Sequence, residues 1–305
     1  MHCPFSFKRI GEEEIGMSVF EKISEKLTAK LRLFSASRGY VCDRCGAEVF
    51  AYPEHRFCVT CEKNMRKNDG LRCGKCGRKT VAEGVCLGCK QRLPKFTKGV
   101  SPFVYRGDTA SLINRIKNGK PRLAYFFGET MAEELLSVCP ELLRFKTKNE
   151  QGRVALSAEN VSNESNVKNA SAEKEEALLV LPVPMTAERK KERGYNQAAE
   201  LAIAVYARLR SSGLEAELDT GVLCKRREAS PQKQLGYVAR AENVAGLFHV
   251  HKRSACKGRT VVLVDDIMTT GATGSECAAR LLGAGAKTVY FLIAAALPEQ
   301  HATYH

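Results

Sequence analysis

The sequence has no long hydrophobic run, and none of its apolar stretches approaches the roughly 18 residues that a membrane-spanning helix needs. The N-terminal stretch MHCPFSFKRIGEEEIGM also lacks the apolar core of a secretory signal. We therefore expect a cytoplasmic protein without membrane insertion.

The chain also has fewer acidic residues than basic ones. It has 34 acidic residues against 48 basic residues, which gives a formal net charge of +14. This balance suits anionic partners such as nucleic acids or phosphorylated metabolites, but it does not choose between them. A charged, solvated surface with no anionic partner is an equally good interpretation.

Cysteine, in contrast, is abundant, with thirteen residues, eight of which form four C-x-x-C pairs. A C-x-x-C turn lets two thiolates converge on one metal ion, and two such pairs complete a tetrahedral shell. In a cytoplasmic protein this pattern favours structural zinc over disulfides. The predicted zinc ligands are Cys42, Cys45, Cys58, Cys61, Cys73, Cys76, Cys86 and Cys89.

The four pairs can be grouped in two ways. Gly46 and Gly77 directly follow the second cysteine of their pairs, where a metal-binding turn favours a positive φ. We therefore favour a sequential grouping, in which the first two pairs hold one ion and the last two hold another, while a cross-braced grouping stays open. With metal bound the segment is only weakly basic, which favours a structural role over nucleic-acid binding.

The composition divides the chain into three parts. Residues 1–38 are expected to form a polar leader with a candidate amphipathic helix, and residues 39–95 a small zinc-ribbon or zinc-knuckle module. Residues 96–305 have the composition of a mixed α/β domain. Within that domain, residues 146–177 are rich in Asn, Ser, Glu and Lys and are predicted to be a disordered surface insertion.

Apolar runs in the third part predict a mainly parallel sheet flanked by helices. Strands are expected at 177–184, 260–264 and 288–297 because these stretches are short, apolar and rich in β-branched residues. Helices are expected at 193–213 and 274–282. A strand, a helix and a strand in this order form a parallel unit of an α/β fold.

The stretch VVLVDDIMTTGATG, residues 261–274, predicts a ligand site. Its aspartates follow a buried strand, and its small residues lead into a helix, which is where ligands bind in open α/β sheets. Free backbone N–H groups and the positive end of the helix would hold a phosphate. The carboxylates would accept hydrogen bonds from ribose hydroxyls or help to hold a cation. Together these features predict a site for a sugar phosphate.

Three other motifs fit this stretch poorly. No lysine stands where a Walker motif needs one after Gly271, and GAGAKT follows a helix instead of a strand, the wrong order for a dinucleotide fingerprint. The acidic pair of a response-regulator receiver would open its domain, whereas Asp266 lies late in this one.

The same stretch resembles the phosphoribosyl-pyrophosphate (PRPP) binding motif of type I phosphoribosyltransferases. The wider chain resembles the ComF family (ComFC/GntX-like), which is associated with DNA uptake in competent bacteria. The stretches that carry this resemblance are the C-x-x-C pairs, YRGDTASLINRIKNGKP, LPVPMTAERKKERGYNQAAELA and KRREASPQKQLGYVARAENVAGLF. The resemblance covers residues 40–297 apart from the insertion.

The resemblance implies a role for each part of the site. Asp265 and Asp266 would be the catalytic pair that holds the ribose 2′- and 3′-hydroxyls, and Mg2+ would bridge pyrophosphate and ribose oxygens. The 5′-phosphate would be held by Thr269, Thr270, Gly271, Ala272 and Thr273. Pyrophosphate would be contacted by Arg189, Lys190 and Arg193. A hood over 225–244 would close the site with Arg226, Arg227, Gln232, Gln234 and Arg240.

Two functions follow from the resemblance. In the first, the protein transfers a ribosyl phosphate from PRPP to an unidentified nitrogen acceptor and releases pyrophosphate. In the alternative, it is a non-catalytic accessory protein of DNA uptake that binds single-stranded DNA or partner proteins. Aromatic residues in 96–127 could stack on bases, but a place in the core is the favoured interpretation. They are Phe96, Phe103, Tyr105, Tyr125, Phe126 and Phe127.

Overall fold

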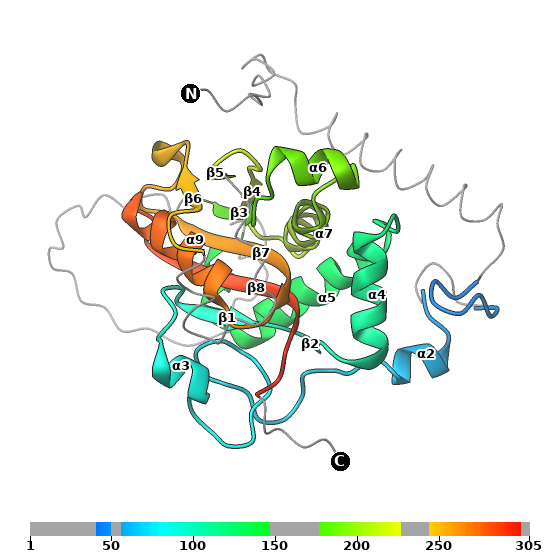
Figure 1. Ribbon diagram of the computed structural model, residues 1–305. Helices are drawn as coiled ribbons and strands as arrows, with labels where there is room; N and C mark the ends of the chain where they lie inside the picture. Colours follow the sequence, from blue (N-terminus) through cyan, green and yellow to red (C-terminus); the bar gives the residue numbers. More distant parts are fainter. Residues whose placement is uncertain (1–40, 50–55, 147–176, 227–243, 300–305) are drawn as a thin grey trace, which may run out of the picture.

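The computed structural model describes residues 41–49, 56–146, 177–226 and 244–299. Its central feature is a parallel sheet with the strand order β1-β8-β7-β3-β4, in which β2 also pairs with β8 (Figure 1). The strands are β1 (Lys98–Val100), β2 (Phe103–Val104), β3 (Leu178–Pro182), β4 (Ala216–Leu218), β7 (Thr260–Met268) and β8 (Thr288–Ala296). Parallel neighbours require crossover connections, and helices supply most of them.

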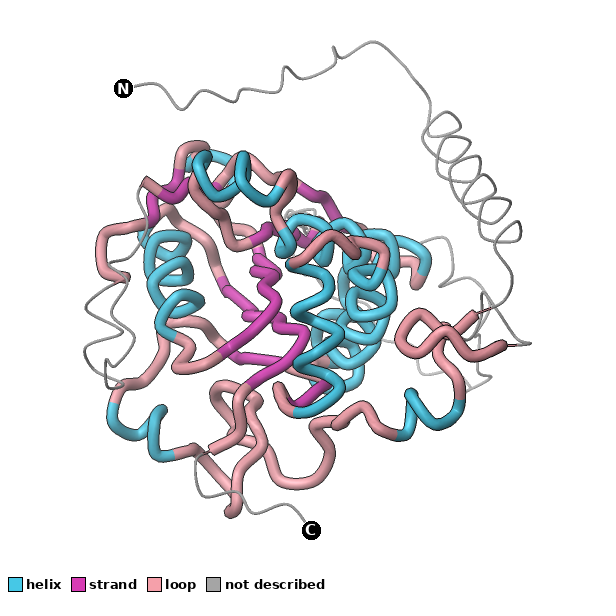
Figure 2. The backbone as a smooth tube through the Cα atoms, turned by 45° about the vertical axis from the view of Figure 1, so that its right-hand side comes forward, coloured by secondary structure: helices cyan, strands magenta, loops and turns pink. Residues whose placement is uncertain are grey.

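Strands β3, β7 and β8 are buried on both faces, which explains why each is almost continuously apolar. Successive side chains of β7 alternate between two apolar clusters: Val262 and Val264 lie in one, and Val261 and Leu263 in the other. Figure 2 shows the strands in the middle of the molecule with helices on both sides.

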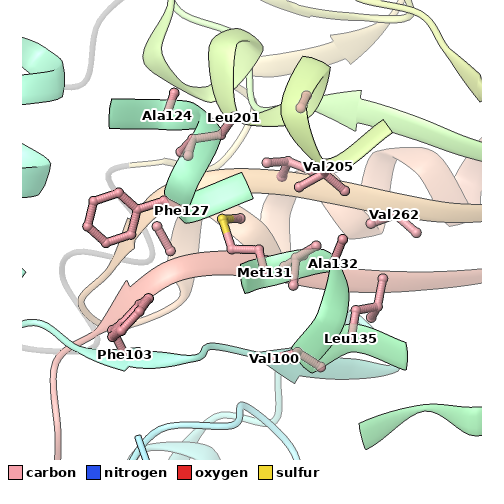
Figure 3. Close-up of a cluster of buried hydrophobic side chains, with 14 of the residues drawn as sticks. Val100, Phe103, Ala124, Phe127, Met131, Ala132, Leu135, Leu201, Val205 and Val262 are labelled. Atoms are coloured by element: carbon pink, nitrogen blue, oxygen red, sulfur yellow. The ribbon is translucent and has the colours of Figure 1, made fainter. Parts of the chain in front are cut away.

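The first cluster lies under α5 (Leu123–Val138) and α7 (Gln197–Ser211). Figure 3 shows Phe127, Met131 and Leu135 of α5 beside Leu201 and Val205 of α7. The two helices approach closely at Gly128, where an added Cβ would lie 2.4 Å from the Cβ of Ala204. Helix α4 (Gly107–Lys117) precedes α5 and packs against it.

The second cluster lies on the opposite face, under α9 (Ala272–Gly283). Helix α9 approaches the sheet closely, because a Cβ added to Gly274 would lie 2.3 Å from the ring of Phe291. The cysteines at 73, 76, 86 and 89 and the ring of Phe96 belong to this cluster as well. The α9 face of the sheet is therefore covered in part by a cysteine-rich segment.

Short elements complete the described part of the chain. They are α2 (Val59–Lys63), α3 (Leu87–Gln91), α6 (Ala187–Arg193), the 3-10 helices at Pro140–Phe145 and Arg253–Ala255, and the antiparallel pair β5 (Leu223–Lys225) and β6 (Phe248–Val250). None of the helices in the described ranges is long and apolar enough to cross a membrane.

The elements differ from the sequence predictions mainly at their ends. Strand β7 continues four residues beyond the predicted 260–264, because its polar end still pairs with β8. The helix predicted over 193–213 begins only at Gln197, since Gly194 adopts a φ of 82° and ends the separate helix α6. The predicted leader, and the predicted insertion apart from its first and last residues, lie outside the described residues.

Most of the aromatic residues considered for stacking on bases belong to the core. Phe96, Phe103 and Phe127 are at most 1% exposed, and Phe126 packs against both Phe103 and Phe127. Tyr125, in contrast, is 39% exposed. The favoured interpretation of these aromatics as core is thus confirmed for the buried three.

Candidate phosphate loop and cysteine groups

The segment from Asp265 to Ala272 joins the end of β7 to the start of α9. Asp265 and Asp266 belong to β7 and are partly buried, and residues 269–271 form the loop. Gly271 has a φ of 81°, and α9 starts at the next residue. The loop therefore lies at the carboxyl end of a central parallel strand, at the position predicted from the sequence.

The start of α9 has only a partial cap. Gly271 offers no side-chain cap, while the Oγ1 of Thr270 accepts a hydrogen bond of 3.3 Å from the backbone N–H of Ala272. The first N–H groups of an α-helix have no partner within the helix, and the helix dipole adds a partial positive charge there. A small cavity of about 30 Å³ adjoins this point, and its lining includes Arg92, Thr270 and Gly271.

The two aspartates have different surroundings. The Oδ1 of Asp265 accepts a hydrogen bond of 2.9 Å from the backbone N–H of Asp266. Burial raises the pKa of Asp265 to about 8, and the neighbouring Asp266 carboxylate adds to the rise. Burial is also the main reason why the pKa of the Cys277 thiol on α9 is raised, with a further contribution from Asp265. Asp265 is therefore a carboxyl group held in a poorly solvated position beside α9.

Asp266 instead forms an ion pair with Lys117, the last residue of α4, over 3.1 Å. The side chains of Asp266 and Lys117 are only 14% and 24% exposed. Sequence reasoning missed Lys117 as a member of the site. Its only local signal is a basic residue at the end of an amphipathic helix, which equally suits the helix dipole, and the partner lies 149 residues away in the chain.

Tyr195 connects the turn between α6 and α7 to the same end of α4. Its hydroxyl donates a hydrogen bond to the carbonyl of Ile116 and accepts one of 3.1 Å from the N–H of Gly119. The side-chain amide of Asn196 donates to the carbonyl of Val183, which directly follows β3. These contacts hold the end of α4, and with it Lys117, beside the carboxyl edge of the sheet. The sequence assigned no role to Tyr195.

The basic residues predicted to contact pyrophosphate all lie on α6. Arg189 and Lys190 are exposed and Arg193 is partly buried. The helix is capped by Thr186, whose Oγ1 accepts a hydrogen bond from the N–H of Arg189. Because α6 follows β3, which neighbours β7 in the parallel sheet, these residues belong to the same edge as the phosphate loop.

The predicted hood is described only at its edges. Arg226 follows β5 and is exposed. Arg227, Gln232, Gln234 and Arg240 lie outside the described residues.

The eight cysteines of the C-x-x-C pairs form two groups of four. Cys42, Cys45, Cys58 and Cys61 make up the first cysteine group, and Cys73, Cys76, Cys86 and Cys89 the second, with all sulfurs of a group within 4.8 Å of one another. This is the sequential grouping that the sequence favours.

The sulfur spacing in both groups suits a zinc ion. The sulfurs of Cys45 and Cys58 are 3.7 Å apart, as are those of Cys76 and Cys86. A tetrahedral zinc site with bonds of about 2.3 Å places its sulfurs about 3.8 Å apart, whereas a disulfide needs about 2.05 Å. The sulfur of Cys73 also accepts hydrogen bonds from the backbone N–H groups of Cys76 and Cys86. Both groups could therefore hold zinc.

Each cysteine group also contacts an arginine. The guanidinium of Arg44 donates to the sulfur of Cys61 over 3.4 Å and forms an ion pair with Asp108 near the start of α4. The guanidinium of Arg78 donates to the sulfur of Cys76 over 3.3 Å and to the carbonyl of Thr269 over 2.7 Å. The second group is thus connected by one side chain to the predicted phosphate loop.

Known proteins share sequence with most of this chain. The competence protein ComFC of Bacillus subtilis (strain 168) is 24% identical over 234 residues, which cover 76% of this chain and 80% of that protein. The DNA utilization protein YhgH of Escherichia coli (strain K12) and that of Shigella flexneri are 24% identical over 234 residues, covering 76% of this chain and 87% of theirs. No family model matches the chain.

Solved structures align with a smaller part. Glutamine PRPP amidotransferase from B. subtilis, complexed with ADP and GMP, is 24% identical with a TM-score of 0.25, over 39% of this chain and 22% of that one. The protein TT1426 from Thermus thermophilus is 20% identical with a TM-score of 0.24, over 43% of this chain and 78% of that one. At such TM-scores the fold assignment rests on the strands and helices of this chain itself.

The mainly parallel sheet, its flanking helices and the cysteine groups before it confirm the predicted fold class, an α/β domain preceded by a cysteine-rich segment. The predicted resemblance to the ComF family is confirmed as well, since this protein is a homologue of ComFC and YhgH.

Proposed function

We propose that this protein binds PRPP together with Mg2+ at the carboxyl end of β7. The observation that carries the proposal is the loop at 269–271, which joins an acidic strand end to a helix start whose N-cap residue is Gly271. Gly271 suits this loop because its φ of 81° is strained for residues with a side chain. The N–H groups that begin α9 would bind the 5′-phosphate, together with Thr269, Thr270 and Thr273.

The aspartates would bind the ribose. Carboxylates accept hydrogen bonds from a vicinal diol, and Asp265 and Asp266 stand directly before the phosphate loop, as the order of groups along a ribose 5-phosphate requires. Lys117 neutralises Asp266 in the ligand-free protein. We expect this ammonium group to remain near the bound ligand, where it would reduce repulsion between the acidic strand end and the phosphates.

The leaving pyrophosphate would lie toward α6, where Arg189, Lys190 and Arg193 supply positive charge. Bound Mg2+ would supply further charge neutralisation on the pyrophosphate. Carboxylate oxygens are suitable ligands for this ion, which usually keeps several waters and binds substrate phosphates. The residues at 227–243 stay predicted as a hood that excludes water from the reaction.

We further propose that zinc fills both cysteine groups, that residues 39–95 form one metal-binding module and that residues 96–305 form the PRPP-binding domain. The reaction we infer is the transfer of a ribosyl phosphate to a nitrogen acceptor with release of pyrophosphate. The names of the relatives ComFC and YhgH support a role in competence and DNA utilization.

Calorimetry tests the binding proposal. Zinc-loaded protein should bind PRPP in the presence of Mg2+, and a variant with Asp265→Asn and Asp266→Asn should bind it at least about tenfold more weakly, since two charge-assisted acceptors are lost. No PRPP binding by the folded, zinc-loaded wild type would overturn the proposal. A screen of nucleobases and amines for PRPP-dependent pyrophosphate release would then identify the acceptor.

A second candidate function is binding of single-stranded DNA without catalysis. A groove of about 570 Å³ beside α2 favours it, because the groove is lined by four basic and two acidic residues: Lys63, Arg66, Lys67, Lys79, Glu62 and Asp69. Binding should weaken steeply as salt rises, because the phosphates release counterions. A variant with Lys63→Gln and Lys67→Gln that binds DNA as tightly as the wild type would argue against this groove.

A further inference from the structure

Arg78 connects the second cysteine group to the phosphate loop. Its Nε donates to the sulfur of Cys76 over 3.3 Å, and its Nη2 donates to the carbonyl of Thr269 over 2.7 Å. Arg78 is only 8% exposed, so this contact is part of the packed interior. Thr269 is the first residue after β7, and it stands 191 positions from Arg78 in the sequence.

The burial of Arg78 requires a compensating negative charge. A guanidinium stays protonated in proteins, and a buried charge without a partner is strongly unfavourable. Four thiolates around one zinc ion carry a net charge of −2. The second cysteine group, when it holds metal, therefore supplies the charge that lets Arg78 stay buried beside the loop.

The guanidinium of Arg78 holds the loop at Thr269 in a fixed position relative to Cys76. The group is planar and rigid, so its two donors keep the sulfur of Cys76 and the carbonyl of Thr269 in a fixed relation. A trans peptide points its N–H away from its C=O. Holding the carbonyl of Thr269 toward the cysteine group therefore directs the N–H of Thr270 to the opposite side of the loop.

Other contacts hold the residues around the second cysteine group against β1, β8 and α9. The turn at Gly77 lies so close to β1 that an added Cβ would be 2.3 Å from the carbonyl oxygen of Gly99. The backbone N–H of Lys95 donates to the Oγ of Ser275 in the first turn of α9. The ring of Phe96 packs 5.2 Å from that of Phe291, centroid to centroid. The group is thus a firm support against which Arg78 can hold the loop.

We propose that Arg78 is a positioning residue, through which the metal-bound second cysteine group holds the phosphate loop in the conformation that binds a ribose 5-phosphate group. This inference rests on the proposed PRPP function. It assigns the second group a part in ligand binding, whereas Arg44 of the first group contacts Asp108 at the start of α4, the opposite end of that helix from Lys117.

The test compares Arg78→Gln with Arg78→Lys and with the matched control Arg44→Gln, all as full-length protein with zinc content measured. Calorimetry would use ribose 5-phosphate and, separately, pyrophosphate with Mg2+. In Arg78→Gln the affinity for ribose 5-phosphate should fall by about tenfold or more, because the ligand would have to order a loop that has lost its charge-assisted hydrogen bond at Thr269. Pyrophosphate affinity should stay within about twofold, a split that general destabilisation would not produce.

The conservative variant and the control sharpen the outcome. Arg78→Lys keeps the charge but loses the rigid fork, so its loss of ribose 5-phosphate affinity should be intermediate. Arg44→Gln should bind both ligands as the wild type does. Unchanged ribose 5-phosphate affinity in zinc-loaded Arg78→Gln would overturn the inference and leave the PRPP proposal intact.

Hydrogen exchange gives a readout that needs no ligand. Amides over 269–275 should exchange faster in Arg78→Gln and Arg78→Lys than in the wild type, and at the wild-type rate in Arg44→Gln. If the wild type bound neither PRPP nor ribose 5-phosphate, the proposed function would fail, and this measurement would still decide whether Arg78 holds the loop. Equal exchange rates in all four proteins would show that Arg78 does not hold the loop.

Discussion

The two cysteine groups share one sequence pattern but have different surroundings. Each consists of two C-x-x-C pairs, and each has an arginine that donates to one of its sulfurs. In the first group Cys45 is exposed and Cys58 partly so, whereas all four cysteines of the second are buried. The first packs into the cluster under α5 and α7, and the second into the cluster under α9.

This difference indicates that the contribution of a metal-binding motif to the fold depends on the residues that it packs against. Both groups share an apolar cluster with residues of β7 and β8, but the cluster of the second group also includes α9, the helix that follows the predicted phosphate loop. The first lies beside α4, and its arginine pairs with a partly exposed carboxylate. Loss of metal from the two groups should therefore have unequal consequences.

The largest effect is expected from removing the cysteine ligands themselves. Cys73→Ser with Cys76→Ser should lower the free energy of unfolding by more than about 4 kcal/mol, because the metal is lost and a buried arginine loses its counter-charge. Cys42→Ser with Cys45→Ser should cost about 1–3 kcal/mol. Denaturant unfolding with zinc analysis measures both. Equal losses would contradict the comparison.

A matched pair of glycines tests the same contrast without touching a ligand. Gly46 and Gly77 follow equivalent cysteines and have φ values of 78° and 72°, but a Cβ added at Gly46 meets no atom of the described residues within 4 Å. Gly46→Ala should destabilise by about 1–2 kcal/mol through backbone strain alone. Gly77→Ala should destabilise by at least about 1 kcal/mol more, since its Cβ would clash with the backbone of Gly99. Thermal melting of both variants would show whether that order holds.

A pH series extends the comparison to the end of β7, which Arg78 connects to the second cysteine group. Burial raises the pKa of Asp265 to about 8, with Asp266 adding to the rise. An unfolded aspartate titrates near about 4, so between these values the folded state binds the extra proton and stability falls as pH rises. In ligand-free protein, Asp265→Asn should therefore flatten the fall in melting temperature between pH 5 and 8.

The control for the pH series lies beside the first group. Asp108→Asn removes the carboxylate that pairs with Arg44, and its melting temperature should keep the wild-type slope over the same pH range. Parallel slopes for the wild type and Asp265→Asn would show that Asp265 ionises normally.

The smallest effect is expected for Arg44→Gln. Arg44 and its partner Asp108 have side chains that are 31% and 24% exposed, and ion pairs of this kind contribute about 1 kcal/mol or less. The variant should lose no more than that in unfolding free energy and should keep its zinc. A loss as large as that of the cysteine variants would mean that the first group, too, depends on its arginine.

Several features of the protein were predictable because their signals are local. The central strands are almost continuously apolar, and the cysteine pairs have the spacing of metal ligands. The predicted phosphate loop lies where two aspartates and a run of small residues at the end of one strand indicated it. The predicted β7 was too short. The run of apolar residues that favours a strand ends at Val264, whereas pairing with β8 continues to Met268.

Other features have no local signal. Lys117 and Asp266 stand 149 residues apart, and nothing around either indicates the other. Tyr195 was part of a recognised stretch, yet its hydrogen bonds to the end of α4 depend on how two separate segments pack. The exposure of Cys45 and the burial of its counterpart Cys76 cannot be read from the shared C-x-x-C pattern.

By itself the sequence determined the elements of this protein: a parallel α/β sheet, eight candidate metal ligands and an acidic strand end before a small-residue loop. Only the tertiary structure decided that the second cysteine group lies under that loop and that Arg78 joins them. The physical reason is that periodicity and spacing act over a few residues, whereas burial of a charge depends on partners brought together by packing of the whole chain.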